Sequence, residues 1–207
     1  MSLRKQNGFS LLELMITVSL ILILGGVTFV AMQPMVNQGH VDSAYDTTLM
    51  AMRNTRNLAI TQSHEYILTF TQTATAGTIQ VQYQGPASPP GGTLPAPLPV
   101  ITYSIPNDVQ FNVQTGFPSS APDGWGTGVV AIDFQQQIAG GTPSVVVFMP
   151  DGSAQDVLGN YNNGVLYLTR PGNSILNSRA ISLMGATGRV RGWRLGQTGA
   201  TYHWVQQ

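Results

Sequence analysis

Gly8-Phe9-Ser10-Leu11-Leu12-Glu13 is the stretch that decides the fold, because it opens an apolar run that continues to Met32. Between Phe9 and Met32 the only formal charge is Glu13. As a helix, these 24 residues span about 36 Å at 1.5 Å per residue, which is enough to cross a bilayer. A carboxylate inside such a segment costs roughly 2.5 to 3.5 kcal/mol on insertion scales, so Glu13 needs a specific role.

The residues before the apolar run predict its orientation. Arg4 and Lys5 place the N-terminus on the cytoplasmic side of the membrane by the positive-inside rule. A secretory signal peptide has a shorter apolar core, and its small-residue cleavage site comes after that core. Here the small residue, Gly8, lies before the run. Cleavage at Gly8 would therefore leave the hydrophobic segment on the mature protein.

Beyond Pro34 the apolar pattern becomes amphipathic. Apolar residues recur at mostly three- and four-residue spacing, at Val41, Tyr45, Leu49, Met52, Leu58 or Ala59, and Ile60. The pattern predicts a helix over residues 9–63, interrupted between Gly25 and Gly39 because glycine and proline weaken helices. Its second half, residues 33–63, is expected to bury one face against the rest of the chain.

Strand signals follow the helix. Alternating, β-branched and aromatic residues predict short strands at 66–71, 78–83, 100–105, 109–113, 129–134, 145–149, 165–169, 180–184, 189–195 and 201–205. Pro150-Asp151-Gly152 predicts a hairpin turn, and the proline- and glycine-rich residues 85–99 predict a loop. Many short strands without intervening helices favour an antiparallel sandwich or a partly open barrel. The predicted fold class is α+β, with the long N-terminal helix packed on an antiparallel β-sandwich in residues 64–207.

The composition excludes several functions. Only 9% of the residues are charged, far below the roughly 25% usual for soluble domains, and the net charge is zero. Without cysteine, the chain has no disulfides, thiolate metal sites or cysteine nucleophiles. The three histidines are far apart, and the sequence has no HExxH, nucleophile elbow or phosphate loop. We therefore expect no catalytic residue, no metal site, no cofactor and no enzyme activity.

The opening stretch, Gly8 to Glu13, resembles the G-F-[ST]-L-x-E signature of type IV prepilins and type II secretion pseudopilins. In that family, prepilin peptidase cuts after the glycine and methylates the new N-terminal residue. The resemblance implies that residues 1–8 are a leader, that cleavage falls between Gly8 and Phe9, and that Phe9 is N-methylated. It also implies a pilin-like inner-membrane protein, with residues 9–32 in the membrane and residues 64–207 in the periplasm. Its partners would be other pilins or pseudopilins, bound through the N-terminal helix of a periplasmic or surface filament.

Three further stretches resemble the minor pilin-like group that includes pseudopilin H and FimT. They are the helical residues 49–60, the strand and turn of residues 147–152, and Gly188-Arg189-Val190-Arg191. This resemblance implies a structural subunit of the type II secretion pseudopilus. One alternative is a FimT-like type IV minor pilin that binds DNA during natural transformation. Another is a membrane-anchored periplasmic binding domain that never polymerises.

Cleavage would give Glu13 a role in assembly. Once Phe9 is the first residue, its amine is cationic at neutral pH. In a filament of axially staggered helices, the amine of one subunit can meet the Glu13 carboxylate of its neighbour. Each charge alone is costly in a low-dielectric bundle, whereas the pair offsets that cost and penalises wrong registers. We therefore expect Glu13 to set the assembly register.

Arginines without neighbouring acids mark the other end of the chain. From residue 170 onward there is no acid, and five arginines occur, at positions 170, 179, 189, 191 and 194. On a strand, Arg189, Arg191 and Trp193 share one face. Together with Arg194 they are the candidate DNA-binding residues, because guanidinium groups hold phosphates and an indole stacks on a base. The alternative is that these arginines pair with the aspartates in the middle of the chain or line a subunit contact.

Overall fold

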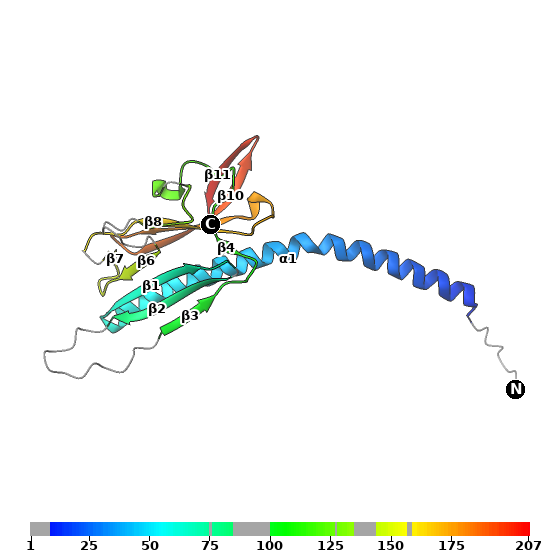
Figure 1. Cartoon of the computed structure of the whole chain (residues 1–207), viewed down its shortest axis with the longest axis horizontal. Coiled ribbons are helices and arrows are strands. Elements are labelled where there is room, and N and C mark those ends of the chain that lie inside the picture. The colour runs from blue at the N-terminus through cyan, green and yellow to red at the C-terminus, as the bar shows by residue number, and fades with distance from the viewer. Residues whose placement is uncertain (1–8, 75, 85–99, 127, 135–143, 157–158) are drawn as a thin grey trace, which may run out of the picture. The chain divides into compact units, whose positions relative to one another are not determined.

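The computed structural model describes residues 9–74, 76–84, 100–126, 128–134, 144–156 and 159–207 (Figure 1). The chain divides into two compact units, Met1–Asn37 and Gln38–Gln207. A single helix, α1 (Leu11–Gln62), begins in the first unit and ends in the second.

The predicted interruption of the helix between Gly25 and Gly39 is wrong, because α1 is continuous through these positions. Proline fixes φ near the helical value and removes only one backbone donor, so a single Pro34 weakens the helix without ending it. The two neighbouring glycines cost about 1 kcal/mol each relative to alanine, which a long apolar helix tolerates.

In the first unit, the surface of α1 is apolar and exposed. Near the N-terminus the helix is strongly apolar and entirely exposed, and it is long and apolar enough to cross a membrane. The hydroxyls of Thr17, Ser19 and Thr28 donate to helix carbonyls three or four residues earlier, at 2.9, 2.8 and 2.8 Å. These polar side chains are therefore satisfied within the helix itself.

The second unit contains two antiparallel sheets. The first has the strand order β3-β2-β1-β6-β7. Its strands are β1 (Glu65–Gln72), β2 (Gly77–Gln84), β3 (Val100–Ser104), β6 (Val145–Phe148) and β7 (Ala154–Gln155). The predicted Pro150-Asp151-Gly152 turn is confirmed: it joins β6 to β7, and the Gly152 N–H donates to the Met149 carbonyl at 2.8 Å. Sequence patterns missed β7, which is only two residues long.

The second sheet has the order β11-β10-β9-β8-β4, and β5 also pairs with β8. Its strands are β4 (Gln110–Phe111), β5 (Ile132–Phe134), β8 (Gly164–Thr169), β9 (Arg179–Met184), β10 (Arg189–Thr198) and β11 (Thr201–Gln206). Two short 3-10 helices, η1 (Pro122–Gly124) and η2 (Ile175–Asn177), lie in the connections. With one long helix and antiparallel sheets, the predicted α+β fold class is confirmed.

One core joins the second part of α1 to both sheets. The buried helix residues in this core are Val41, Ala44, Tyr45, Ala51, Met52 and Ala59, and they share it with residues of β1, β2, β6, β8, β9 and β10. The prediction that this half of the helix buries one face is therefore confirmed at Tyr45 and Met52, among others. Ile60, however, remains 39% exposed. Leu49 and Leu58 are only partly buried.

The second sheet is buried on both faces near β8. Leu166 and Leu168 join the core shared with α1. Val165 and Tyr167 point to the opposite face, as alternation along a strand requires, and join a smaller cluster that includes partly buried Trp204. Burial on both faces explains why β8 has a continuous apolar sequence rather than an alternating one.

Candidate assembly and binding sites

The N-terminal motif lies at the very start of α1. Gly8 and the rest of the predicted leader lie outside the described residues. Phe9 is 83% exposed, and Glu13 occupies the first turn of the helix. The Leu14 N–H donates to the Ser10 carbonyl at 3.2 Å, so the helical hydrogen bonding begins immediately after Ser10. The role of Glu13 in assembly stays a prediction.

A local signal at this end was missed in the sequence. Ser10-Leu11-Leu12-Glu13 has the S-x-x-E spacing of a capping box, in which a serine and a glutamate satisfy the first free N–H groups of a helix. The helix dipole also favours a carboxylate in the first turn. The spacing and the first-turn position of Glu13 therefore both favour the start of α1 at this point.

The arginines predicted to bind DNA fall into two environments. The Arg191 Nη1 donates to Asp123 Oδ1 at 2.6 Å, and the Ser182 hydroxyl donates to Asp123 Oδ2 at 2.5 Å. The Trp193 Nε1 in turn donates to the Ser182 hydroxyl at 2.8 Å. Arg191 and Trp193 thus belong to a polar network that joins η1 to β9 and β10. Arg189 and Arg194, by contrast, are exposed.

The other two arginines in the last part of the chain, Arg170 and Arg179, also have carboxylate partners. Arg170 Nε lies 3.0 Å from Asp108 Oδ2, which His40 Nδ1 also approaches to 2.7 Å. Burial acts to raise the pKa of Asp108, but the hydrogen bond to His40 and the charge of Arg170 outweigh it and hold the pKa below its usual value. Buried Arg179 pairs through Nη2 with Asp42 of α1 at 2.5 Å.

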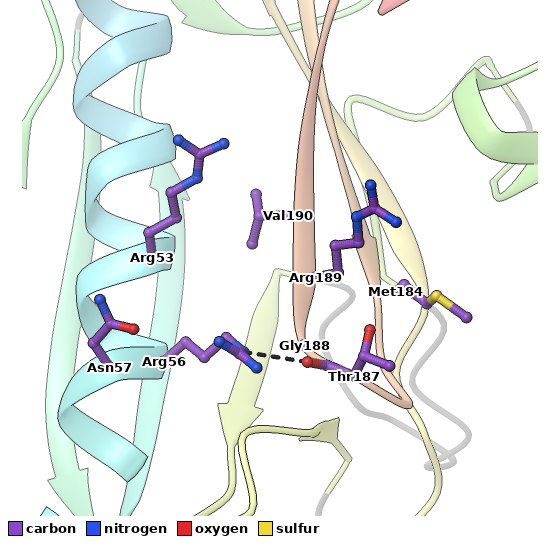
Figure 2. A pocket seen from close by; sticks show the side chains of 8 residues that line it. All are labelled: Arg53, Arg56, Asn57, Met184, Thr187, Gly188, Arg189 and Val190. Atoms are coloured by element: carbon purple, nitrogen blue, oxygen red, sulfur yellow. Dashed lines mark hydrogen bonds between the residues drawn. The ribbon is translucent and has the colours of Figure 1, made fainter. Parts of the chain in front are cut away.

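A groove of about 560 Å³ lies between the second part of α1 and the start of β10 (Figure 2). Its lining includes Arg53, Arg56 and Asn57 of the helix, together with Thr187, Gly188 and Arg189. None of the residues that line it carries a carboxylate. Sequence reasoning missed this groove, because Arg53 and Arg56 are spaced like ordinary solvated residues on the polar face of an amphipathic helix.

Arg56 is anchored inside the groove by backbone carbonyls rather than by an acid. Its Nε donates to the Gly152 carbonyl at 3.1 Å and to the Thr187 carbonyl at 3.2 Å. Gly188 has a φ of +60°, and a Cβ at this position would collide with the Gly152 carbonyl oxygen and lie 2.9 Å from Arg56 Nε. The glycine therefore keeps open the space in which the guanidinium lies, and neutral acceptors leave its positive charge uncompensated.

Arg53 and Arg189 flank this anchored guanidinium. Figure 2 shows Arg53 and Arg56 reaching from the helix toward β10, whereas Arg189 leaves the strand on the side away from the helix. Val190 points toward the helix, as strand alternation requires. The inner part of the groove is therefore positively charged through Arg53 and Arg56, and Arg189 adds a third cation near its edge.

Comparison with known families bears on the N-terminal motif. Residues 3–29 match the family described as the prokaryotic N-terminal methylation motif. The chain carries a type IV pilin-like N-terminus. This motif is typical of type IV pilin-like proteins that prepilin peptidase processes. No curated protein and no solved structure matches the chain. Membership of the pilin-like group of pseudopilin H and FimT stays a prediction.

Proposed function

We propose that this chain is a minor pilin-like subunit that assembles into the pseudopilus of a type II secretion system. Prepilin peptidase cleaves it between Gly8 and Phe9 and methylates the Phe9 amine. The observation that carries the proposal is the methylation motif over residues 3–29. It is joined to an apolar helix that is long enough to span a membrane and whose apolar part is not buried against the rest of the chain.

The physical logic of assembly follows from the two ends of the motif. Before cleavage, Glu13 is one carboxylate near the end of an apolar helix, and the leader blocks the Phe9 amine. Cleavage creates a cation four residues away from that carboxylate. Within a bundle of parallel helices, the Phe9 amine of one subunit then pairs with Glu13 of the next. A subunit in the wrong register leaves both charges unpaired in a medium of low dielectric constant, which is strongly unfavourable.

Mass spectrometry of the mature N-terminus tests the processing step. We expect the chain to begin at N-methylated Phe9 and Gly8→Leu to block both cleavage and assembly. Gly25→Ala is the matched control, since a Cβ there would contact nothing within 4 Å, and it should be processed normally. Unaltered mobility and function of Gly8→Leu would rule out every pilin-like role and favour the membrane-anchored binding domain.

Glu13→Gln separates processing from assembly. The substitution keeps the shape of the side chain and removes its charge, so cleavage should proceed while the chain is lost from sheared filaments. Normal incorporation of Glu13→Gln would contradict the proposed role in register. Genes beside this one, from either a secretion operon or a pilus operon, would decide between the pseudopilus and a type IV pilus.

The DNA-binding alternative has one observation in its favour, which is that Arg189 and Arg194 are exposed. The ion pair between Arg191 and Asp123 supports the structural role instead, because a phosphate would have to compete with a carboxylate at 2.6 Å. Replacing Arg189 and Arg191 with alanine and measuring the affinity of the soluble domain for single-stranded DNA tests the alternative. An affinity that does not change would exclude it.

A further inference from the structure

Two turns from different sheets hold the side chain of Arg56 in the groove. Its Nε donates to the Gly152 carbonyl of the β6–β7 turn at 3.1 Å and to the Thr187 carbonyl of the β9–β10 turn at 3.2 Å. Each turn also contains a glycine of positive φ, Gly152 at +82° and Gly188 at +60°. A Cβ at Gly152 would lie 3.1 Å from Arg56 Nη2, and a Cβ at Gly188 would lie 2.9 Å from Arg56 Nε. The two turns therefore form a cradle that restricts the orientation of the guanidinium.

The other end of this guanidinium remains available to a ligand. Arg56 lines the groove, and in the part of the chain that the structure describes both of its hydrogen bonds are made by Nε. A guanidinium anchored in this way still presents two parallel N–H groups, one on Nη1 and one on Nη2. Two parallel N–H groups match the two oxygens of a carboxylate.

No acid of the chain neutralises this site. All nine aspartates and glutamates of the sequence lie among the described residues, and none of them lines the groove. Asp151, which precedes the anchoring Gly152, accepts through Oδ1 from the Ser153 N–H at 2.8 Å. Arg53, one helical turn before Arg56, also lines the groove and adds to its positive potential. The groove therefore combines an oriented donor with positive charge that lacks a counterion.

The surroundings of Arg56 favour an acidic side chain over other small anions. Ile60 is 39% exposed, and its Cδ1 lies 2.9 Å from the position that a Cβ of Gly152 would take, beside Arg56 Nη2. A carboxylate on an aliphatic stem can bury carbon against Ile60, whereas inorganic phosphate has no carbon to bury. Capture of a peptide C-terminus uses free backbone N–H groups. Here the N–H groups of Gly152 and Gly188 already donate to carbonyls of their own turns.

A nucleic acid fits the groove less well. None of the described residues that line it is aromatic, whereas surfaces for single strands rely on stacking of bases. Its cations are Arg53, Arg56 and Arg189, and so few phosphate contacts release too few counterions for tight binding at physiological salt. The lining therefore suits one carboxylate better than a chain of phosphates.

We propose that this groove is a docking site for a glutamate side chain of a partner protein. The carboxylate accepts two parallel hydrogen bonds from Nη1 and Nη2 of Arg56, and its aliphatic stem contacts Ile60. The charge of Arg53 steers the acidic segment toward the groove. The groove lies wholly within the second unit, so this contact is separate from the N-terminal motif and does not depend on its processing.

Nuclear magnetic resonance of the full chain in detergent micelles tests the site. The probe is an acetylated and amidated Gly-Leu-Glu-Leu-Gly peptide, and the reporters are the backbone amides of Thr187 and Gly188. We expect their resonances to shift and saturate with this peptide, but not with the same peptide carrying glutamine. Arg56→Gln should weaken binding about tenfold or more, because a charge-assisted contact is lost. Arg194→Gln, which removes an exposed arginine outside the groove, should bind like wild type.

A second variant separates binding from the structural role of Arg56 in holding the two turns. Arg53→Gln leaves both anchoring hydrogen bonds intact, so it should weaken binding several-fold without changing the spectrum of the free chain beyond its neighbours. Equal shifts with the two peptides, no shift with either, or unchanged affinity in both arginine variants would overturn the inference. Tighter binding of inorganic phosphate, of a dT oligonucleotide or of a peptide whose only carboxylate is its C-terminus would overturn it as well.

Discussion

Gly192→Ala is expected to destabilise the second unit, because Gly192 of β10 packs directly against the ring of Tyr45 in α1. A Cβ at this position would overlap the Tyr45 hydroxyl oxygen and lie 2.6 Å from Cζ and 3.0 Å from Cε2. Tyr45 is buried, so the ring has little room to move. Overpacking of this kind costs about 1 to 3 kcal/mol. For a domain of this size, that is a fall in Tm of roughly 2 to 12 °C.

The measurement is urea unfolding of a soluble chain that begins at Gln38, with circular dichroism as the signal for unfolding. Tyr45→Phe removes the hydroxyl and should recover part of the loss in a double variant with Gly192→Ala, with a coupling free energy of about 0.5 to 3 kcal/mol. Gly196→Ala in the same strand is the control. Its Cβ would meet the side chains of Val205 and His203 at 3.1 and 3.2 Å, and both residues are exposed and can shift. Equal midpoints for wild type and Gly192→Ala would refute the packing of α1 against β10 described above.

Two further predictions concern ion pairs inside the second unit. Asp42→Asn removes the partner of Arg179, whose side chain is only 3% exposed, and should lower the free energy of unfolding by about 1.5 to 3 kcal/mol in the same urea assay. The control Asp46→Asn, at an exposed site, should change the free energy of unfolding by less than about 0.5 kcal/mol. Equal losses in the two variants would contradict the pairing of Asp42 with Arg179. Burial acts to raise the pKa of Asp108, but the hydrogen bond to His40, a backbone hydrogen bond and the charge of Arg170 together hold it below its unfolded value. Its contribution to stability is therefore present above about pH 4 and is lost as the pH falls through the folded pKa. Stability measured from pH 6 down to pH 2 should therefore fall less in Asp108→Asn than in wild type, and identical slopes would exclude the pair.

The elements of this fold could be predicted because each has its own periodicity. The apolar run after Gly8 has the length of a membrane span, and the later runs alternate or are rich in β-branched residues. The prediction was wrong about the interruption of the helix, where local propensity at Gly25, Gly26 and Pro34 was given too much weight. β7 was missed because a two-residue strand has no period, and it forms only because the turn at Gly152 brings it beside β6.

The partners of the arginines could not be predicted in the same way. Asp123 pairs with Arg191 across 68 residues, and Asp123 itself has a φ of +58° in η1, a backbone conformation that no sequence pattern indicated. Asp42 pairs with Arg179 across 137 residues, from a helix to a strand. Counting charges along the chain left two interpretations open, an unopposed cationic end and pairing with the aspartates in the middle of the chain, and could not name the pairs. In the structure three of the five arginines have carboxylate partners, at positions 170, 179 and 191, and for Arg170 and Arg191 the partner is an aspartate in the middle of the chain.

This internal pairing leaves few charges to act between subunits. With 9% of residues charged and no net charge, long-range attraction between copies is weak, because exposed charges are screened within about 10 Å at ordinary salt. In the proposed assembly, encounter would then come from confinement in the membrane, which would hold the apolar helices parallel and raise their effective concentration.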